Sequence, residues 1–191
     1  MTVHLATDIL WLVWITSWLL AAFWADRAAK RPAAADEILY RVVTIIGGIM
    51  LFAFRGRYPF EIRLWHVNLI TAWALFGVSF AGFVFCWWAR IYLGKLWSGW
   101  VTRKADHKII DTGPYAVVRH PIYTGFIAAL FALAAMRGTA LAFAGAVVMT
   151  LGFYTKARLE ERFLREELGA EGYDDYRRRV PMLLPFGPKA A

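Results

Sequence analysis

The longest uncharged stretch of this sequence decides its fold class. It runs from Leu64 to Ala89 and reads LWHVNLITAWALFGVSFAGFVFCWWA. An α-helix rises 1.5 Å per residue, so about 20 apolar residues cross a hydrocarbon core of about 30 Å. The stretch has 26 residues and exceeds that length. It therefore predicts a membrane-spanning helix.

Four further uncharged runs complete the membrane-crossing pattern. They are Ile9–Ala25, Val42–Phe54, His120–Met136 and Gly138–Thr155. The second reaches spanning length if its helix begins near Ile38 and Arg41 extends its charge to the interface. The pair Arg137-Gly138 separates the last two runs and is typical of the tip of a tight helical hairpin. Five crossings is the best count, and four crossings plus a re-entrant hairpin is the alternative.

The composition also fits a membrane protein. Hydrophobic residues make up 60% of the 191-residue chain and charged residues 19%, whereas a soluble domain averages about 25% charged residues. Asp8 stands before the first run, where a signal peptide carries basic residues, and no small-residue cleavage pattern follows. We therefore expect the first segment to be a retained helix.

The distribution of basic residues assigns an orientation to these helices. Cytoplasmic loops of membrane proteins carry an excess of Lys and Arg. If the N-terminus lies outside, 18 of the 22 basic residues fall in the inner segments. We therefore expect an outer N-terminus and a cytoplasmic C-terminus. The tip at Arg137 then lies outside, and Lys104 and His107 lie inside.

The net charge of +8 has the same explanation. Basic residues beside membrane helices face anionic headgroups, and the sequence contains no zinc-finger spacing or aromatic-basic RNA motif, so nucleic acid is not an expected partner. The single cysteine, Cys86, lies in the middle of the third predicted helix. It excludes an intrachain disulfide, and we interpret it as a packing residue.

Polar residues divide the chain into two parts. Residues 1–89 are predicted to form a three-helix membrane scaffold, in which Trp11, Trp14 and Trp18 recur at helical spacing for lipid contact or helix packing. Residues 90–191 are predicted to form the catalytic half, with a cytoplasmic loop, the helical hairpin and a C-terminal segment. In that segment, Lys156–Leu168 predicts a cytoplasmic amphipathic helix that ends at Gly169.

The candidate site begins at the entrance to the fourth helix, where the sequence reads RHPIY from Arg119. Proline favours the first helical turn because its missing N–H costs nothing there, so Pro121 should begin the helix with His120 beside its cap. His120, Tyr123 and Thr124 then share one face. The helix N-terminus and Arg119 together predict an anion site. A purely structural cap is the alternative.

A second set of polar residues follows the fifth run. Glu160 and Glu161 are adjacent there and stand beside Arg158. Adjacent carboxylates diverge on a helix, so we expect at most one to enter a pocket and the other to pair with Arg165. The hairpin should return this pair to the neighbourhood of His120. A solvated charge run is the alternative. If the pocket exists, it suits a ligand with a carboxylate, a ribose and an adenine, because a glutamate accepts from ribose hydroxyls.

Together these residues resemble a known family. The chain contains Gly113-Pro-Tyr-x-x-x-Arg-His-Pro-x-Tyr-x-Gly125, then Arg158-x-Glu-Glu161, then Tyr173-x-x-Tyr176. This combination resembles the isoprenylcysteine carboxyl methyltransferase family, which with the phospholipid methyltransferases forms a related set of integral membrane enzymes using S-adenosylmethionine. Leu93-Gly94-x-x-Trp97-Ser98 and Pro185 are similar to its bacterial members. The resemblance covers about half of the chain, from residue 90 to residue 185.

The resemblance implies an all-α integral membrane methyltransferase of the bacterial inner membrane, with S-adenosylmethionine as cofactor and an apolar or lipid-like acceptor that enters from the bilayer. The acceptor atom is left open between O, N and S. Candidate catalytic residues are His120, as a base for an amine acceptor, and Arg158, facing either cofactor or acceptor. The residues implied for cofactor binding are Tyr115, Arg119, His120, Tyr123, Glu160 and Glu161.

Two other classes compete with this interpretation. A membrane-embedded NADPH-dependent reductase of the sterol reductase type has a related C-terminal arrangement with an Arg-His-Pro-Asn-Tyr pattern. Here Ile122 stands at the Asn position, and the paired glutamates favour the methyltransferase. A non-catalytic lipid-binding or transport protein would not need a polar site confined to one face of the membrane.

Overall fold

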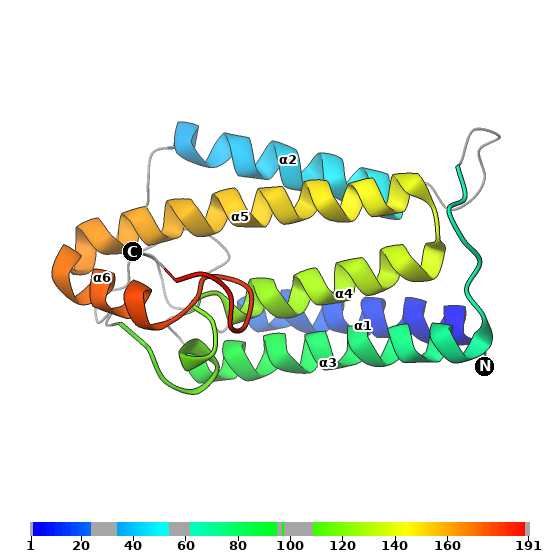
Figure 1. The fold of residues 1–191 in the computed structure, drawn as a ribbon, viewed down its shortest axis with the longest axis horizontal. Coiled ribbons are helices and arrows are strands. Elements are labelled where there is room, and N and C mark those ends of the chain that lie inside the picture. The colour runs from blue at the N-terminus through cyan, green and yellow to red at the C-terminus, as the bar shows by residue number, and fades with distance from the viewer. Residues whose placement is uncertain (1, 24–33, 54–61, 95–96, 98–108, 190–191) are drawn as a thin grey trace.

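The computed structural model describes residues 2–23, 34–53, 62–94, 97 and 109–189 of the chain. Within these residues, regular structure is helical apart from one isolated bridge between Arg63 and Thr139. Long helices run alongside one another in Figure 1, namely α1 (Val3–Ala22), α2 (Ala34–Phe52), α3 (Leu69–Leu93), α4 (Pro121–Arg137) and α5 (Ala140–Leu168). A 3-10 turn, η2 (Gly113–Ala116), precedes α4, and the short helix α6 (Ala170–Arg179) follows α5.

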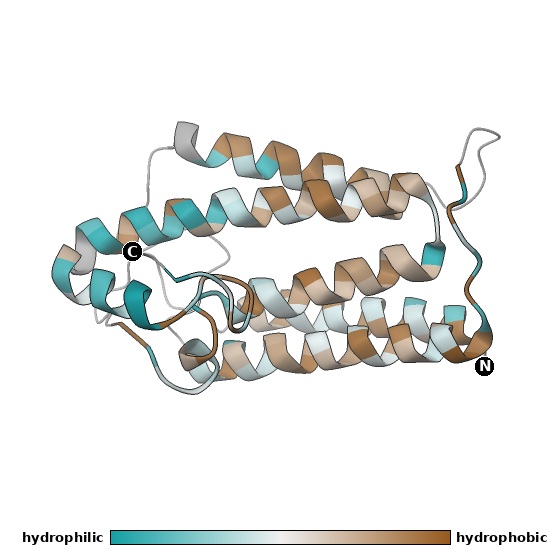
Figure 2. Cartoon of the chain, viewed as in Figure 1, coloured by the Kyte–Doolittle hydropathy of each residue, from teal (hydrophilic) through white to brown (hydrophobic). Residues whose placement is uncertain are grey.

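Three helices in the described part of the chain are long and apolar enough to cross a membrane, namely α1, α3 and the Ala140–Glu166 part of α5. The apolar helix α4 has 17 residues, which is about 26 Å at 1.5 Å per residue. Figure 2 shows that hydrophilic residues gather at the C-terminal end of α5 and in α6, at one end of the bundle. The chain is thus an all-helical integral membrane protein. Crossings by α2 and α4 stay a prediction.

A two-residue connection joins α4 to α5. Gly138 ends α4 in the left-handed conformation, with φ of 66°, which glycine adopts at little cost. The side chain of Thr139 then caps α5 by accepting from the amide of Ala142. The predicted hairpin tip at Arg137-Gly138 is therefore confirmed.

The N-terminal helices pack against this hairpin. α2 lies against α5, and α3 lies against α4 with α1 beside it. Glycines allow the close approach, since a Cβ built on Gly82 of α3 would overlap the carbonyl of Gly125 on α4. A Cβ on Gly47 of α2 would likewise overlap the backbone of Met149 on α5. Small residues at such contacts let helix backbones pack closely in lipid.

Aromatic rings fill the space between α1, α3 and α4. Trp14 stacks with Phe83 at 4.7 Å between ring centroids and with Phe126 at 4.9 Å. Both Trp11 and Trp14 are buried, so this part of the tryptophan stripe packs helices together and does not face lipid. Cys86 is completely buried, and its thiol donates to a backbone carbonyl of α4 at 3.2 Å. It is a packing residue, as the sequence predicts.

α5 continues without a break through its charged C-terminal part. The stretch Lys156–Leu168, predicted as a separate amphipathic helix, is the last part of α5 itself. The helix continues because no Gly or Pro lies between Gly152 and Gly169. α6 and the segment after it, residues 180–189, which we call the tail, then fold back onto the N-terminal end of α4 (Figure 1). There the amide of Arg119 donates to the carbonyl of Pro181 at 2.9 Å.

Candidate functional site

The candidate site lies where the N-terminal end of α4 meets the C-terminal third of α5. Pro121 is the first residue of α4 and His120 is its N-cap, as the proline predicts. Because the hairpin is tight and its helices pack side by side, α5 returns to the level at which α4 begins. This brings Glu160 and Glu161 into contact with His120.

The imidazole of His120 contacts both carboxylates. Its Nδ1 lies 3.5 Å from Oε2 of Glu160, and its Nε2 lies 3.2 Å from Oε1 of Glu161. Both carboxylates therefore reach the same imidazole, although the sequence predicts that at most one of them enters a pocket. The reason is that an imidazole carries nitrogens on two edges of its ring, so one ring reaches two carboxylates that diverge on the helix.

These contacts also govern the protonation of His120. Burial by itself lowers the pKa of the imidazole, but the hydrogen bonds and charges of Glu160 and Glu161 outweigh burial and hold the pKa above its ordinary value. The site thus favours the imidazolium, in which both ring nitrogens donate. A ring in this state is poorly suited to act as a general base.

Glu160 faces the less enclosed side of the site. The hydroxyl of Tyr123 donates to its Oε1 at 2.6 Å, and Nζ of Lys156 lies 3.9 Å from the same atom. The rings of Tyr123 and His120 stack at 5.4 Å between centroids, nearly parallel. The Glu160 side chain is 17% exposed, against 5% for Glu161. Of the two carboxylate side chains, that of Glu160 is the more exposed.

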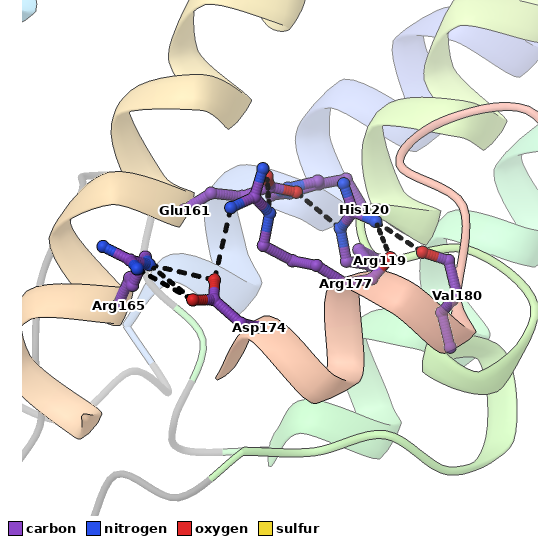
Figure 3. A network of polar contacts seen from close by, with 7 residues as sticks. All are labelled: Arg119, His120, Glu161, Arg165, Asp174, Arg177 and Val180. Carbon is purple, nitrogen blue, oxygen red and sulfur yellow. Dashed lines mark hydrogen bonds and ion pairs between the residues drawn. The ribbon is translucent and has the colours of Figure 1, made fainter. Parts of the chain in front are cut away.

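Glu161, together with Arg119, instead joins four segments of the protein (Figure 3). Nε of Arg119 donates to its Oε1 at 2.6 Å, and Nε of Arg177 on α6 lies 3.5 Å from its Oε2. The terminal nitrogen Nη1 of Arg119 donates to the carbonyls of Val180 and Arg177. Glu161 and Arg119 thereby tie α4 and α5 to α6 and the tail.

Two arginines make other contacts than those that the sequence predicts. Arg119 is buried and makes these contacts within the protein, so it is not placed to hold a ligand carboxylate. Arg165 does not pair with Glu161. Its Nε and Nη2 contact the carboxylate of Asp174 at 2.8 to 3.0 Å (Figure 3), because α6 folds back beside α5. These hydrogen bonds hold the pKa of Asp174 below its usual range.

The remaining predicted residues lie in different places. Tyr115 is buried on η2, where its carbonyl accepts from the hydroxyl of Tyr176 at 2.8 Å, and burial raises the pKa of its phenol. Arg158 is exposed on α5. It is two residues before Glu160, about 200° around the helix, and so points away from Glu160. Lys104 and His107 lie outside the described residues.

Sequence reasoning missed three residues near the site. Lys156 precedes Glu160 by four residues, and that helical spacing is a signal that could have found it. Tyr40 on α2 lies beside Lys156, with its ring centroid 5.7 Å from Nζ. Arg177 on α6 faces Glu161. Neither Tyr40 nor Arg177 has a sequence signal, because each reaches the site from another element.

Residues 73–166 match the isoprenylcysteine carboxyl methyltransferase (ICMT) family. The matched segment includes most of α3, all of α4 and α5 as far as Glu166. It therefore contains His120, Tyr123 and both site glutamates.

Characterised relatives carry several names. The chain is 32% identical to methanethiol S-methyltransferase 2 of Bradyrhizobium diazoefficiens over 81% of this chain and 61% of the relative. It is 33% identical to protein-S-isoprenylcysteine O-methyltransferase B of Arabidopsis thaliana over 45% of this chain and 44% of the relative. It is 26% identical to the cobalt-zinc-cadmium resistance protein CzcN of Cupriavidus metallidurans over 75% of this chain and 60% of the relative. The chain spans about 60% of the length of the two methanethiol S-methyltransferases of Bradyrhizobium diazoefficiens. The matched segment, residues 73–166, thus belongs to the ICMT-like family.

Proposed function

We propose that this chain is an integral membrane methyltransferase that uses S-adenosylmethionine and acts on a small or apolar acceptor entering from the bilayer. One observation carries the proposal: His120 and Tyr123 meet Glu160 and Glu161 at the end of an apolar helical hairpin, inside the segment that matches the ICMT family. The names of relatives, one a methanethiol S-methyltransferase and one an isoprenylcysteine O-methyltransferase, support methyl transfer.

The residues present fit this cofactor at three positions. Glu160 is the more exposed carboxylate and keeps lone pairs beyond its bond from Tyr123, so it is the residue that would accept from ribose hydroxyls. His120 holds Glu160 in place through Nδ1, and Tyr123 presents a ring and a hydroxyl beside it. Arg119 does not fit the role of carboxylate ligand, because its contacts join the tail to α4.

When bound, S-adenosylmethionine supplies an electrophilic methyl group on a sulfonium sulfur. A thiolate or carboxylate acceptor then needs no general base, which agrees with a His120 ring whose two nitrogens both face carboxylates. The work of the protein is therefore to orient the reactants and exclude water. In this proposal His120 is a positioning residue, and Arg158, on the face of α5 opposite Glu160, does not contact the cofactor.

The acceptor class follows from the same reasoning. The helices around the site are apolar and aromatic, which favours an acceptor with little polar surface. The relatives named for methanethiol and isoprenylcysteine act on a thiol and on a prenylated amino acid. We therefore propose a thiolate or a carboxylate, carried on a small or apolar group, as the nucleophile.

The test uses the purified protein in lipid nanodiscs. S-adenosylhomocysteine should raise the temperature of unfolding in a concentration-dependent way and NADPH should not, because a ligand stabilises the state that it binds. Radiolabel from S-adenosylmethionine should then pass to short alkyl thiols or prenylcysteine analogues. Stabilisation by NADPH alone would support the reductase, and stabilisation by neither compound would favour a lipid-binding protein.

A further inference from the structure

Lys156 places its ammonium between two tyrosine rings from different helices. Its Nζ lies 5.7 Å from the ring centroid of Tyr40 on α2 and 5.4 Å from that of Tyr123 on α4. Both distances are within the roughly 6 Å over which a cation is attracted to an aromatic ring. The same nitrogen lies 3.9 Å from Glu160. Three helices therefore converge on one position, which the protein fills with a positive charge; we call it the cation position.

The cation position is sheltered from water and firmly built. The side chain of Lys156 is 12% exposed, and Tyr40 is buried against Leu159 and Phe163 of α5. Attraction between a cation and aromatic rings grows when both are withdrawn from water. The close packing of α2 on α5 holds the Tyr40 ring at this place.

We propose that the cation position binds the sulfonium of the methyl donor, and that Lys156 fills it only while the donor is absent. This inference rests on the proposed function. The sulfonium of S-adenosylmethionine is joined to the ribose through a single methylene. If Glu160 accepts from the ribose hydroxyls, the sulfonium lies within a few ångströms of Glu160, as Nζ of Lys156 does now. A sulfonium has no N–H to donate, so aromatic faces and carboxylates are the groups that stabilise it.

Glu37 on α2 offers a place for the displaced ammonium. It is buried and precedes Tyr40 by three residues, so the two share a face of α2. Its Oε2 accepts from Arg41, while its Oε1 has no hydrogen-bond partner among the residues that the structure describes. A buried carboxylate oxygen without a partner is costly, and the lysine ammonium sits on a flexible four-carbon stem. Movement of Lys156 towards Glu37 would satisfy that oxygen and open the cation position.

The test compares two ligands that differ in charge at sulfur. S-adenosylmethionine is a sulfonium cation, and S-adenosylhomocysteine is a neutral thioether. We would measure the Kd of each by titration in nanodiscs, without acceptor. Tyr40→Leu should weaken the binding of S-adenosylmethionine about tenfold and change the Kd of S-adenosylhomocysteine less than about twofold. Tyr40→Phe keeps an aromatic face and should bind both like wild type. Tyr154→Leu, the same change at an exposed tyrosine of α5, is the matched control and should alter neither Kd.

If Tyr40→Leu weakens the binding of both ligands equally, or changes neither Kd, the inference is overturned. If Tyr40→Leu does not yield folded protein, Lys156→Met decides in its place. Removal of a like charge should raise the preference for S-adenosylmethionine over S-adenosylhomocysteine several-fold, and an unchanged preference would overturn the inference. A wild-type protein that binds neither ligand would instead contradict the proposed function.

Discussion

At the scale of single residues, Glu160 and Glu161 are neighbours in the chain but have different surroundings. Glu161 is held by Arg119, His120 and Arg177 and is almost completely buried. Glu160 contacts Tyr123 and the ammonium of Lys156, and retains some exposure. We therefore expect Glu161 to stabilise the fold, and Glu160 to bind the ligand.

Replacing each glutamate by glutamine separates these roles. Glu160→Gln weakens a charge-assisted hydrogen bond of about 1.5–3 kcal/mol, so affinity for S-adenosylhomocysteine should fall about ten- to a hundredfold. Glu161→Gln should leave affinity within a few-fold of wild type. It should destabilise the fold by about 3 kcal/mol, because Arg119 stays buried without its counter-charge. Titration calorimetry measures the affinity of both variants for S-adenosylhomocysteine, and thermal unfolding measures their stability. Loss of affinity in the Glu161 variant alone would reverse the assignment.

His120 should make stability depend on pH. Folding raises the pKa of His120, so the folded protein binds this proton more tightly than the unfolded chain. The stabilisation is fully present below the ordinary pKa of about 6.5 and is lost as the pH rises through the raised value. Unfolding temperatures of wild type and His120→Gln should therefore differ most at about pH 6 and converge as the solution becomes alkaline. Parallel curves for the two proteins would contradict the raised pKa.

At the scale of secondary-structure elements, the site depends on how closely the helices approach. α4 begins at the site and packs along α3, where Gly82 and Gly125 bring the two backbones into contact. The tail adds a second constraint, since the hydroxyl of Thr124 donates to the carbonyl of Leu183 at 2.5 Å. The first turn of α4 is therefore held by α3 at one side and by the tail at another.

Adding a methyl group at this contact should separate the helices. In Gly82→Ala the new Cβ would overlap the backbone carbonyl of Gly125, which has no flexible side chain to move aside. We expect a loss of about 1–3 kcal/mol, as for other overpacked cores. Gly77→Ala, on the same helix with nothing within 4 Å of the new Cβ, is the control and should be neutral. Thermal unfolding in nanodiscs compares the two, and equal stability would contradict the close contact.

At the scale of the whole molecule, the hairpin tip and the site lie at opposite ends of the bundle. The tip joins the segment before α3, where the amide of Ala140 donates to the carbonyl of Ile62 and Arg63 pairs with Thr139. α6 and the tail lie at the other end, beside the start of α4 (Figure 1). If the bundle crosses the membrane along its length, these two ends face different compartments.

Cysteine labelling from each side tests this arrangement. In a Cys86→Ala background, Arg63→Cys should react with a membrane-impermeant maleimide added outside, and Lys189→Cys only after the inner face is opened. Both residues are exposed in the structure. We place the end that holds α6 and the tail inside because the sequence has an excess of Lys and Arg in the segments predicted to lie on that side. External labelling at position 189 would invert the orientation.

The sequence by itself determined the helical membrane class, the hairpin tip at Gly138, the start of α4 at Pro121 and the meeting of His120 with the paired glutamates. Each depends on local properties, namely hydropathy, the missing N–H of proline, the left-handed glycine and the short connection that returns α5 to the start of α4. Only the tertiary structure decided which glutamate is the more exposed, that Arg119 ties α6 and the tail to α4, and that Tyr40 borders Lys156. These depend on how α2 packs on α5 and how α6 folds back, and contacts between distant elements leave no spacing in the sequence.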